Sequence, residues 1–169
     1  MKTKKLTRLA LLTALALILF TVEAQFPLPV AIPGIKLGLS NVVSLFAVYW
    51  FGRKEAAVIL AIRIVLGNLI CGTVSAMLYS AAGGICCLLV MCLLCGVIPA
   101  RQAWVLSILG AIAHVLGQMA AAVFIAGTAS ILMYLPVLLI ACVATGAITG
   151  VAATLVLKRL QRRDAVHNQ

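Results

Sequence analysis

Six continuously apolar runs, separated by short polar connections, constrain the fold of this chain more than any other feature. Their approximate limits are 6–22, 34–51, 56–72, 76–97, 103–126 and 131–157. A helix rises about 1.5 Å per residue, so roughly 20 apolar residues cross the hydrocarbon core of a bilayer. The runs lack the alternation of apolar and polar residues that is typical of barrel strands. The sequence therefore predicts an all-α, polytopic membrane protein with six transmembrane helices.

Composition limits what else the chain can contain. Of the 169 residues, 65% are hydrophobic and 9% are charged, whereas soluble domains average about 45–50% apolar and about 25% charged residues. We therefore expect a single membrane domain over residues 1–169, with no separate soluble catalytic domain.

The basic residues follow the connections between the runs. The formal net charge is +10, but eleven of the 13 basic residues flank the apolar runs: Lys2, Lys4, Lys5, Arg8, Arg53, Lys54, Arg101, Lys158, Arg159, Arg162 and Arg163. The connections 23–33, 73–75 and 127–130 carry no basic residue. The positive-inside rule then predicts a multi-pass membrane protein with both termini in the cytoplasm. A nucleic-acid surface is excluded, because base-stacking aromatics and a basic structured face are missing.

The N-terminal run allows two interpretations. A lysine-rich start, an apolar core and Val22-Glu23-Ala24 resemble a secretory signal with its cleavage site. Ala10 and Ala14, however, form a small-xxx-small pair suited to close contact with another helix, and we predict that they form a partner interface. Gly146 and Gly150 in the last run are a second such pair. Ordinary packing within the chain is the alternative explanation for both pairs.

Arg63 is the most unusual residue of the apolar runs. It lies near the middle of the third run, where a charge costs about 2.5–3.5 kcal/mol even on the most lenient insertion scale. No acidic residue lies inside any run, since Glu23 and Glu55 stand at ends and Asp164 is in the tail. Arg63 therefore binds an anionic ligand in a cavity, binds backbone carbonyls, or extends its charge toward the membrane surface.

Further polar residues of four runs fall at the midplane or in the predicted outer half. Pro33–Asn41 opens the second run, and its glycines at 34 and 38 suit close backbone approach. Polar groups are costly in lipid, so this asymmetry predicts a pocket open to the outside and sealed below. The alternative is interhelical hydrogen bonds, worth about 0.6 kcal/mol each. The predicted substrate-binding residues are Lys36, Asn41, Arg63, Asn68, Tyr79, His114 and Gln118.

The six cysteines do not indicate a metal or redox site. Cys86, Cys87, Cys92 and Cys95 all lie in the fourth run, without a second pair at ligand spacing, and buried thiols commonly act as small apolar fillers. A phosphate loop, an HExxH helix and a Ser-His-Asp arrangement are also missing. We expect neither a metal nor a cofactor, and no enzyme activity.

Several segments together resemble a known family. They are Pro33–Asn41, Arg63-Ile-Val-Leu-Gly67, Leu78-Tyr-Ser-Ala-Ala-Gly-Gly84 and Gly110-Ala-Ile-Ala-His114 with Gly117-Gln118. They resemble the Gx transporter family, which is also labelled heptaprenyl diphosphate synthase component I. The six-run layout and the Ala10/Ala14 pair are similar to the substrate-binding S-components of energy-coupling-factor (ECF) vitamin transporters.

The resemblance implies an S-component-like bundle that takes up a small anionic metabolite. In that group a coupling subunit and two cytoplasmic ATPases supply the energy. Ala10 and Ala14 would then meet the coupling subunit, and residues 23–33 would cap the pocket. The synthase label is a further expectation. Prenyl diphosphate synthases hold Mg²⁺ with clustered aspartates, and this chain has one aspartate, Asp164. The label therefore implies a noncatalytic membrane component of heptaprenyl diphosphate or menaquinone metabolism, with a prenyltransferase partner, or of a membrane electron-transfer system.

Overall fold

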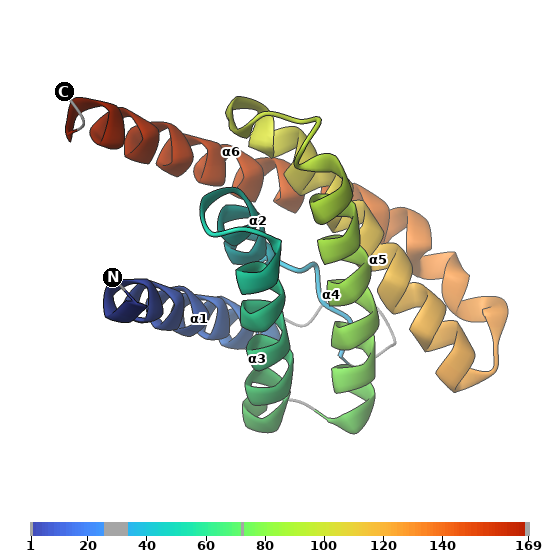
Figure 1. Ribbon diagram of the computed structural model, residues 1–169. Helices are drawn as coiled ribbons and strands as arrows, with labels where there is room; N and C mark the ends of the chain where they lie inside the picture. Colours follow the sequence, from blue (N-terminus) through green and yellow to red (C-terminus); the bar gives the residue numbers. More distant parts are fainter. Residues whose placement is uncertain (1, 26–33, 72, 168–169) are drawn as a thin grey trace.

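The chain folds into helices of very different lengths (Figure 1). The computed structural model describes residues 2–25, 34–71 and 73–167. The elements are α1 (Lys2–Gln25), α2 (Asn41–Trp50), α3 (Arg53–Cys71), α4 (Val74–Leu94), η1 (Ala100–Gln102), α5 (Ala103–Ala126), η2 (Ala129–Tyr134) and α6 (Leu135–His167). These three stretches contain no strand, so the prediction of an all-helical fold is confirmed.

Local sequence sets several helix ends. Thr73 precedes α4 in an extended conformation, and its side chain accepts a hydrogen bond from the backbone N–H of Ala76, which satisfies one of the free donors of the first turn. Gly127 ends α5 in the left-handed conformation, with φ of 65°, which glycine adopts without steric cost.

The second predicted span is wrong in its extent. Only Asn41–Trp50 are helical, and residues 34–40 form an irregular segment. Gly34 and Gly38 have φ angles of 97° and 83°, a region incompatible with a right-handed helix. With ten residues, α2 is about 15 Å long and covers about half of a hydrocarbon core.

Four helical stretches are long and apolar enough to cross a membrane: Thr3–Gln25, Val74–Leu94, Ala100–Ala126 and Ala129–Arg162. The 19-residue α3 is not among them, because it contains four charged residues: Arg53, Lys54, Glu55 and Arg63. Large apolar side chains face outward on α3, α5 and α6. Leu69, Phe124 and Ile140 are 74%, 88% and 75% exposed, as expected of a surface that meets lipid rather than water.

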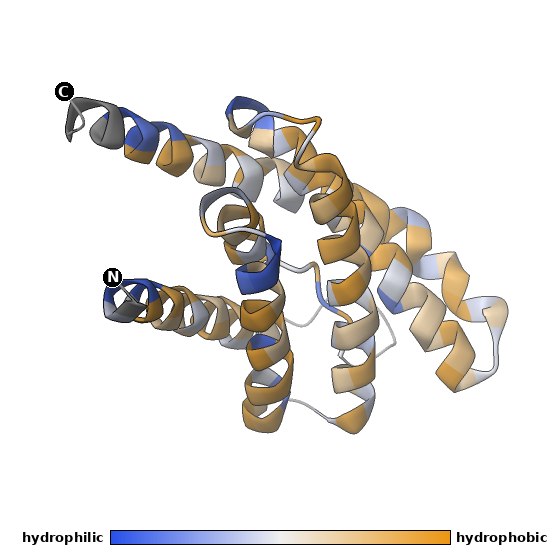
Figure 2. Ribbon diagram, in the orientation of Figure 1, coloured by the Kyte–Doolittle hydropathy of each residue, from blue (hydrophilic) through white to orange (hydrophobic). Residues whose placement is uncertain are grey.

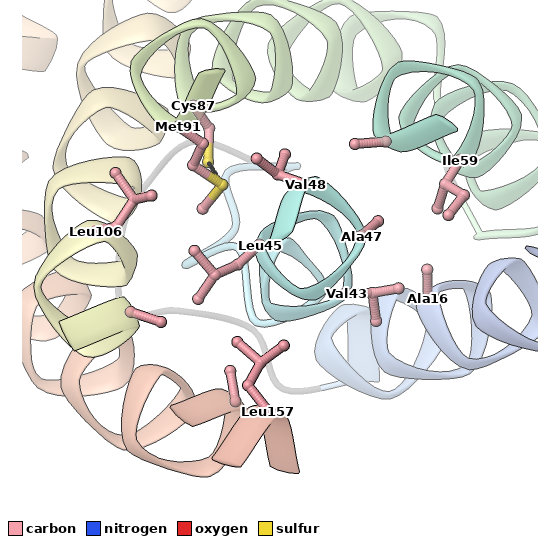
Figure 3. Packing of buried hydrophobic residues seen from close by; sticks show 13 residues of the cluster. Ala16, Val43, Leu45, Ala47, Val48, Ile59, Cys87, Met91, Leu106 and Leu157 are labelled. Atoms are coloured by element: carbon pink, nitrogen blue, oxygen red, sulfur yellow. Dashed lines mark hydrogen bonds between the residues drawn. The ribbon is translucent and has the colours of Figure 1, made fainter. Parts of the chain in front are cut away.

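The short helix α2 lies at the centre of the bundle. Figure 3 looks along α2 and shows Val43, Leu45, Ala47 and Val48 pointing outward from it. The side chains that meet them come from all five other α-helices: Ala16 of α1, Ile59 of α3, Cys87 and Met91 of α4, Leu106 of α5 and Leu157 of α6. This cluster is the apolar core that packs the six α-helices together.

A second apolar cluster lies farther along α5. It joins Tyr79 of α4 and Ile35 to Val115 and Met119 of α5 and Leu138 of α6. The buried polar residues fall at the start of α2 and at the facing positions of α3, α4 and α5.

The basic helix ends gather at one end of the bundle. Lys5 of α1 forms a salt bridge with Glu55 at the start of α3, and the Tyr49 hydroxyl donates to the Ile98 carbonyl, 2.8 Å away. Figure 2 shows the hydrophilic residues concentrated at this end. The contacts thus bring the start of α1, the α2–α3 turn and the α4–α5 connection together, as their shared positive charge predicts.

Candidate functional site

The irregular segment 34–40 is held in place by two polar side chains from other helices. The Glu23 carboxylate of α1 accepts hydrogen bonds from the backbone N–H groups of Gly38 and Leu39, at 2.5 and 3.1 Å. The Gln118 Oε1 of α5 accepts one from the N–H of Lys36, at 3.1 Å. A buried backbone without helical hydrogen bonds needs such partners, so these two residues make the break in the helix possible.

Arg63 lies against the start of α2. Its Nη1 donates to the Ser40 Oγ at 2.9 Å and to the Asn41 Oδ1 at 3.0 Å, and the residue is 2% exposed. Its guanidinium therefore stays within the bundle and does not extend to the membrane surface, which excludes the alternative considered from the sequence.

His114 completes the layer from α5. Its Nε2 lies 2.7 Å from the Nε2 of Gln118, one helical turn away. The ring packs on Gly38, where an added Cβ would lie 2.9 Å from the His114 Cδ2 and 2.5 Å from the Asn41 Nδ2. Gly38 is therefore required both by its positive φ and by the space that these side chains occupy.

Lys36 brings a second cation into the same layer. Its Nζ stands 3.2 Å from the centre of the Phe20 ring, a cation–π contact. The layer thus holds two cations, Lys36 and Arg63, and one carboxylate, Glu23, all less than 9% exposed. The salt bridge found in the described part of the chain, Lys5–Glu55, lies at the other end of α3.

Several buried polar side-chain atoms, four of them in this layer, have no hydrogen-bond partner within the described ranges. They are Lys36 Nζ, Asn41 Nδ2, Ser44 Oγ, Arg63 Nε, Asn68 Oδ1, Ser80 Oγ and His114 Nδ1. Buried polar groups are nearly always paired in native proteins. A cluster of unpaired ones therefore indicates a place where water or a ligand supplies the missing partners.

The structure brings five of the predicted substrate-binding residues together: Lys36, Asn41, Arg63, His114 and Gln118. Asn68 is buried, but its Nδ2 donates to the Ile64 carbonyl of its own helix, 2.8 Å away. Tyr79 packs into the second apolar cluster. Ala10 and Ala14 lie on the exposed face of α1. The predicted cap, 23–33, falls mostly outside the described residues.

Sequence reasoning missed Glu23 and Phe20. Glu23 was assigned to the connection after the first run, yet α1 continues to Gln25 and buries it. The signal available was helical spacing, because Ala16, Phe20 and Glu23 follow one another at four and three residues and share a face. The prediction that Arg63 lacks an internal carboxylate is thus corrected, since Glu23 lies in the same layer.

The fold and this layer define the class: an all-helical protein with four stretches of membrane-crossing length and a buried, cation-rich polar layer at the start of a half-length helix. The chain belongs to the heptaprenyl diphosphate synthase component I family, because the sequence model of that family matches residues 12–156. This confirms the predicted family. No curated protein and no solved structure matches the chain. Within the described ranges, no three His, Cys, Asp or Glu side chains are placed to hold a metal ion.

Proposed function

We propose that this chain is a substrate-binding membrane subunit, similar to an S-component, for the uptake of a small anionic metabolite. The observation that carries the proposal is the buried charge of the polar layer. Two cations face one carboxylate there, so one positive charge is left without a counterpart. Such a charge in a medium of low dielectric constant favours the binding of an anion.

The start of α2 adds to this preference. A helix N-terminus carries a partial positive charge, and interrupted membrane helices direct such ends at anionic substrate groups. Arg63 contacts the first residues of α2, and its Nε and the Lys36 Nζ have no other hydrogen-bond partner in the described chain. These buried donors provide the second, independent support for an anion site at this helix end.

The proposed subunit lies in a bacterial plasma membrane with both termini in the cytoplasm. Six membrane segments are counted, with residues 34–50 as a half-helix and its irregular lead-in, and α3 as a crossing whose central charge, Arg63, is buried. The chain itself does not catalyse a reaction. An ECF-type coupling subunit with two ATPases would supply the energy, and the exposed Ala10 and Ala14 of α1 are the proposed contact with the coupling subunit.

Arg63 is the first residue to test. The purified chain, reconstituted in neutral lipid nanodiscs, is examined by mass spectrometry for retained small molecules, and the binding of the anions found is measured at equilibrium without ATP. We expect Arg63→Gln to weaken binding at least about tenfold, since a charge-assisted hydrogen bond is worth about 1.5–3 kcal/mol.

Arg53→Gln is the matched control, because Arg53 begins the same helix and is exposed. This change should leave the affinity unaltered. Equal affinities of the Arg63→Gln variant and the parent chain, with both folded by circular dichroism, would remove the anion site from the proposal.

A second candidate function follows from the family description. The chain would then be a noncatalytic membrane component of heptaprenyl diphosphate or menaquinone metabolism. Affinity purification of the tagged chain from its native membrane separates the two candidates. A prenyltransferase among the copurified proteins supports this second function, and ATPases with a coupling subunit support the first.

A further inference from the structure

Two hollows share one lining residue, Val42, in the first turn of α2. The first is a narrow crevice lined by polar and small residues: Gly38, Asn41, Ser107, Thr145, Gly146 and Thr149, with Leu37, Leu39, Val42 and Ala111. The second is an apolar groove of about 190 Å³. Its lining is Leu12 and Leu15 of α1, Val42, Val43 and Phe46 of α2, and Ala152, Ala153 and Val156 of α6.

The two hollows follow one face of α6. Thr145 and Thr149 line the crevice, and Ala152 and Val156 line the groove. Their spacing of four, three and four residues places them along a single helical stripe. The stripe changes from hydroxyl-bearing to wholly apolar side chains along its length, which is the pattern that an elongated amphiphilic molecule would fit.

The polar end of this path is linked to the cation-rich layer. Asn41 lines the crevice, and its Oδ1 accepts a hydrogen bond from Arg63. Its Nδ2 is buried and has no partner in the described chain. This arrangement leaves an N–H donor, polarised by the neighbouring guanidinium, directed to where the crevice meets Gly38.

From this arrangement we propose that the groove binds the hydrocarbon tail of a single-chain carboxylate amphiphile, with the carboxylate toward Asn41. The proposal rests on the anion-binding function above and names the class of its ligand. The groove is somewhat larger than a cavity of about 150 Å³ that holds one benzene molecule, so it has room for a segment of one chain and not for two. The crevice has about the space of one water, which suits one carboxylate oxygen better than a diphosphate.

Photocrosslinking tests the location of the tail directly. The full chain in neutral phosphatidylcholine nanodiscs is labelled with dodecanoate that carries a diazirine in mid-chain, and the crosslinked residues are identified by peptide mass spectrometry. We expect the crosslinks to fall in residues 42–46 of α2 and 152–156 of α6. Unlabelled dodecanoate should compete for these sites. Dodecanol should compete more weakly, because it lacks the charge.

One substitution closes the groove without entering the core. Ala152 is exposed and lines the groove, so a phenylalanine there occupies the space of the tail. Ala152→Phe should reduce the crosslink yield at least about fivefold, since each buried methylene contributes to affinity. Ala144→Phe is the control, because Ala144 is exposed on the same helix and lines neither hollow.

Crosslinks spread evenly over the lipid-facing helices, or an unchanged yield in Ala152→Phe, would overturn the proposal, as would equal competition by phosphatidylglycerol or farnesyl diphosphate. The small-anion assay with Arg63→Gln reports on the binding function separately. A loss of anion binding in that variant together with scattered crosslinks would contradict tail binding in the groove and would still support the anion site. Crosslinks confined to the groove without any Arg63-dependent binding would remove the carboxylate assignment and the anion site together.

Discussion

The two terminal helices carry the same small-residue pattern and use it in opposite ways. In α6, Gly146 and Gly150 pack directly on α5, where a Cβ at Gly150 would lie 2.6 Å from the Trp104 Cα. In α1, Ala10 and Ala14 are exposed, and the helix is held through other residues. The same four-residue spacing thus serves internal packing in one helix and leaves an unpartnered face in the other.

The largest expected loss of stability follows from a substitution at Gly150. Gly150→Leu places a side chain against the backbone of Trp104, which is within 3.0 Å of the site and cannot rotate away. Overpacking of this kind costs about 1–3 kcal/mol or more. Ala14→Leu, on the exposed face of α1, should change stability by less than about 0.5 kcal/mol. Thermal unfolding of both variants in the same detergent measures the difference, and equal losses would contradict the contrast between the two helices.

The second largest loss of stability is expected when the hydrogen bonds between α1 and the segment 34–40 are removed. Glu23→Ala removes the acceptor of the Gly38 and Leu39 N–H groups. Both hydrogen bonds are only part-buried, so water replaces part of what is lost and we expect a cost of about 1 kcal/mol. We expect faster amide exchange of residues 38 and 39, measured by hydrogen–deuterium exchange, with little change in α6. Glu23→Gln is the matched variant. Because its amide retains one acceptor oxygen, its exchange rates should lie between those of Glu23→Ala and the parent chain.

The smallest effect is at the other end of α1. The hydrogen bond from Lys5 lowers the pKa of the Glu55 carboxyl below its ordinary value. Since this pKa is lower in the folded chain, the contribution of the pair is complete above the ordinary pKa of 4.5 and is lost as the pH falls through the lowered value. Thermal unfolding of Lys5→Ala should differ slightly from that of the parent at pH 7 and converge with it at low pH. A difference that persists in acid would show that Lys5 acts through packing.

Most helices could be located from the sequence because their apolar runs are long and uninterrupted. The predicted range 103–126 is the range of α5, and the runs that become α1, α3 and α4 differ by a few residues at their ends. The run 131–157 was shifted, since η2 precedes α6 and the helix continues into the basic tail as far as His167. Pro136, in the first turn of α6, is a helix-start signal that the apolar run alone does not use. The basic tail carries no glycine or proline to mark the end of the helix.

The prediction of a helix over the second run, 34–51, was wrong for a specific reason. Gly34 and Gly38 have the spacing of a helix-packing motif, but their positive φ angles break the helix. Composition cannot distinguish the two roles of glycine, because both need a residue without Cβ. The information lies in distant residues, Glu23 and Gln118, that accept the hydrogen bonds of the freed backbone. Arg63, His114 and Gln118 could be identified as candidates because polar residues are rare in membrane runs. The segment that they contact was also singled out, but its non-helical conformation could not be predicted.

The shortness of α2 has a consequence for how the chain enters a membrane. Ten helical residues cannot be retained by the insertion machinery as a separate crossing, and α3 arrives with the uncompensated charge of Arg63. The start of α2 supplies hydrogen-bond acceptors for the Arg63 guanidinium of α3, through Ser40 and Asn41. These contacts hold the short helix against its longer neighbour. We therefore expect α2 and α3 to enter a membrane together as one hairpin, joined by the same Arg63 contacts that hold them in the folded bundle.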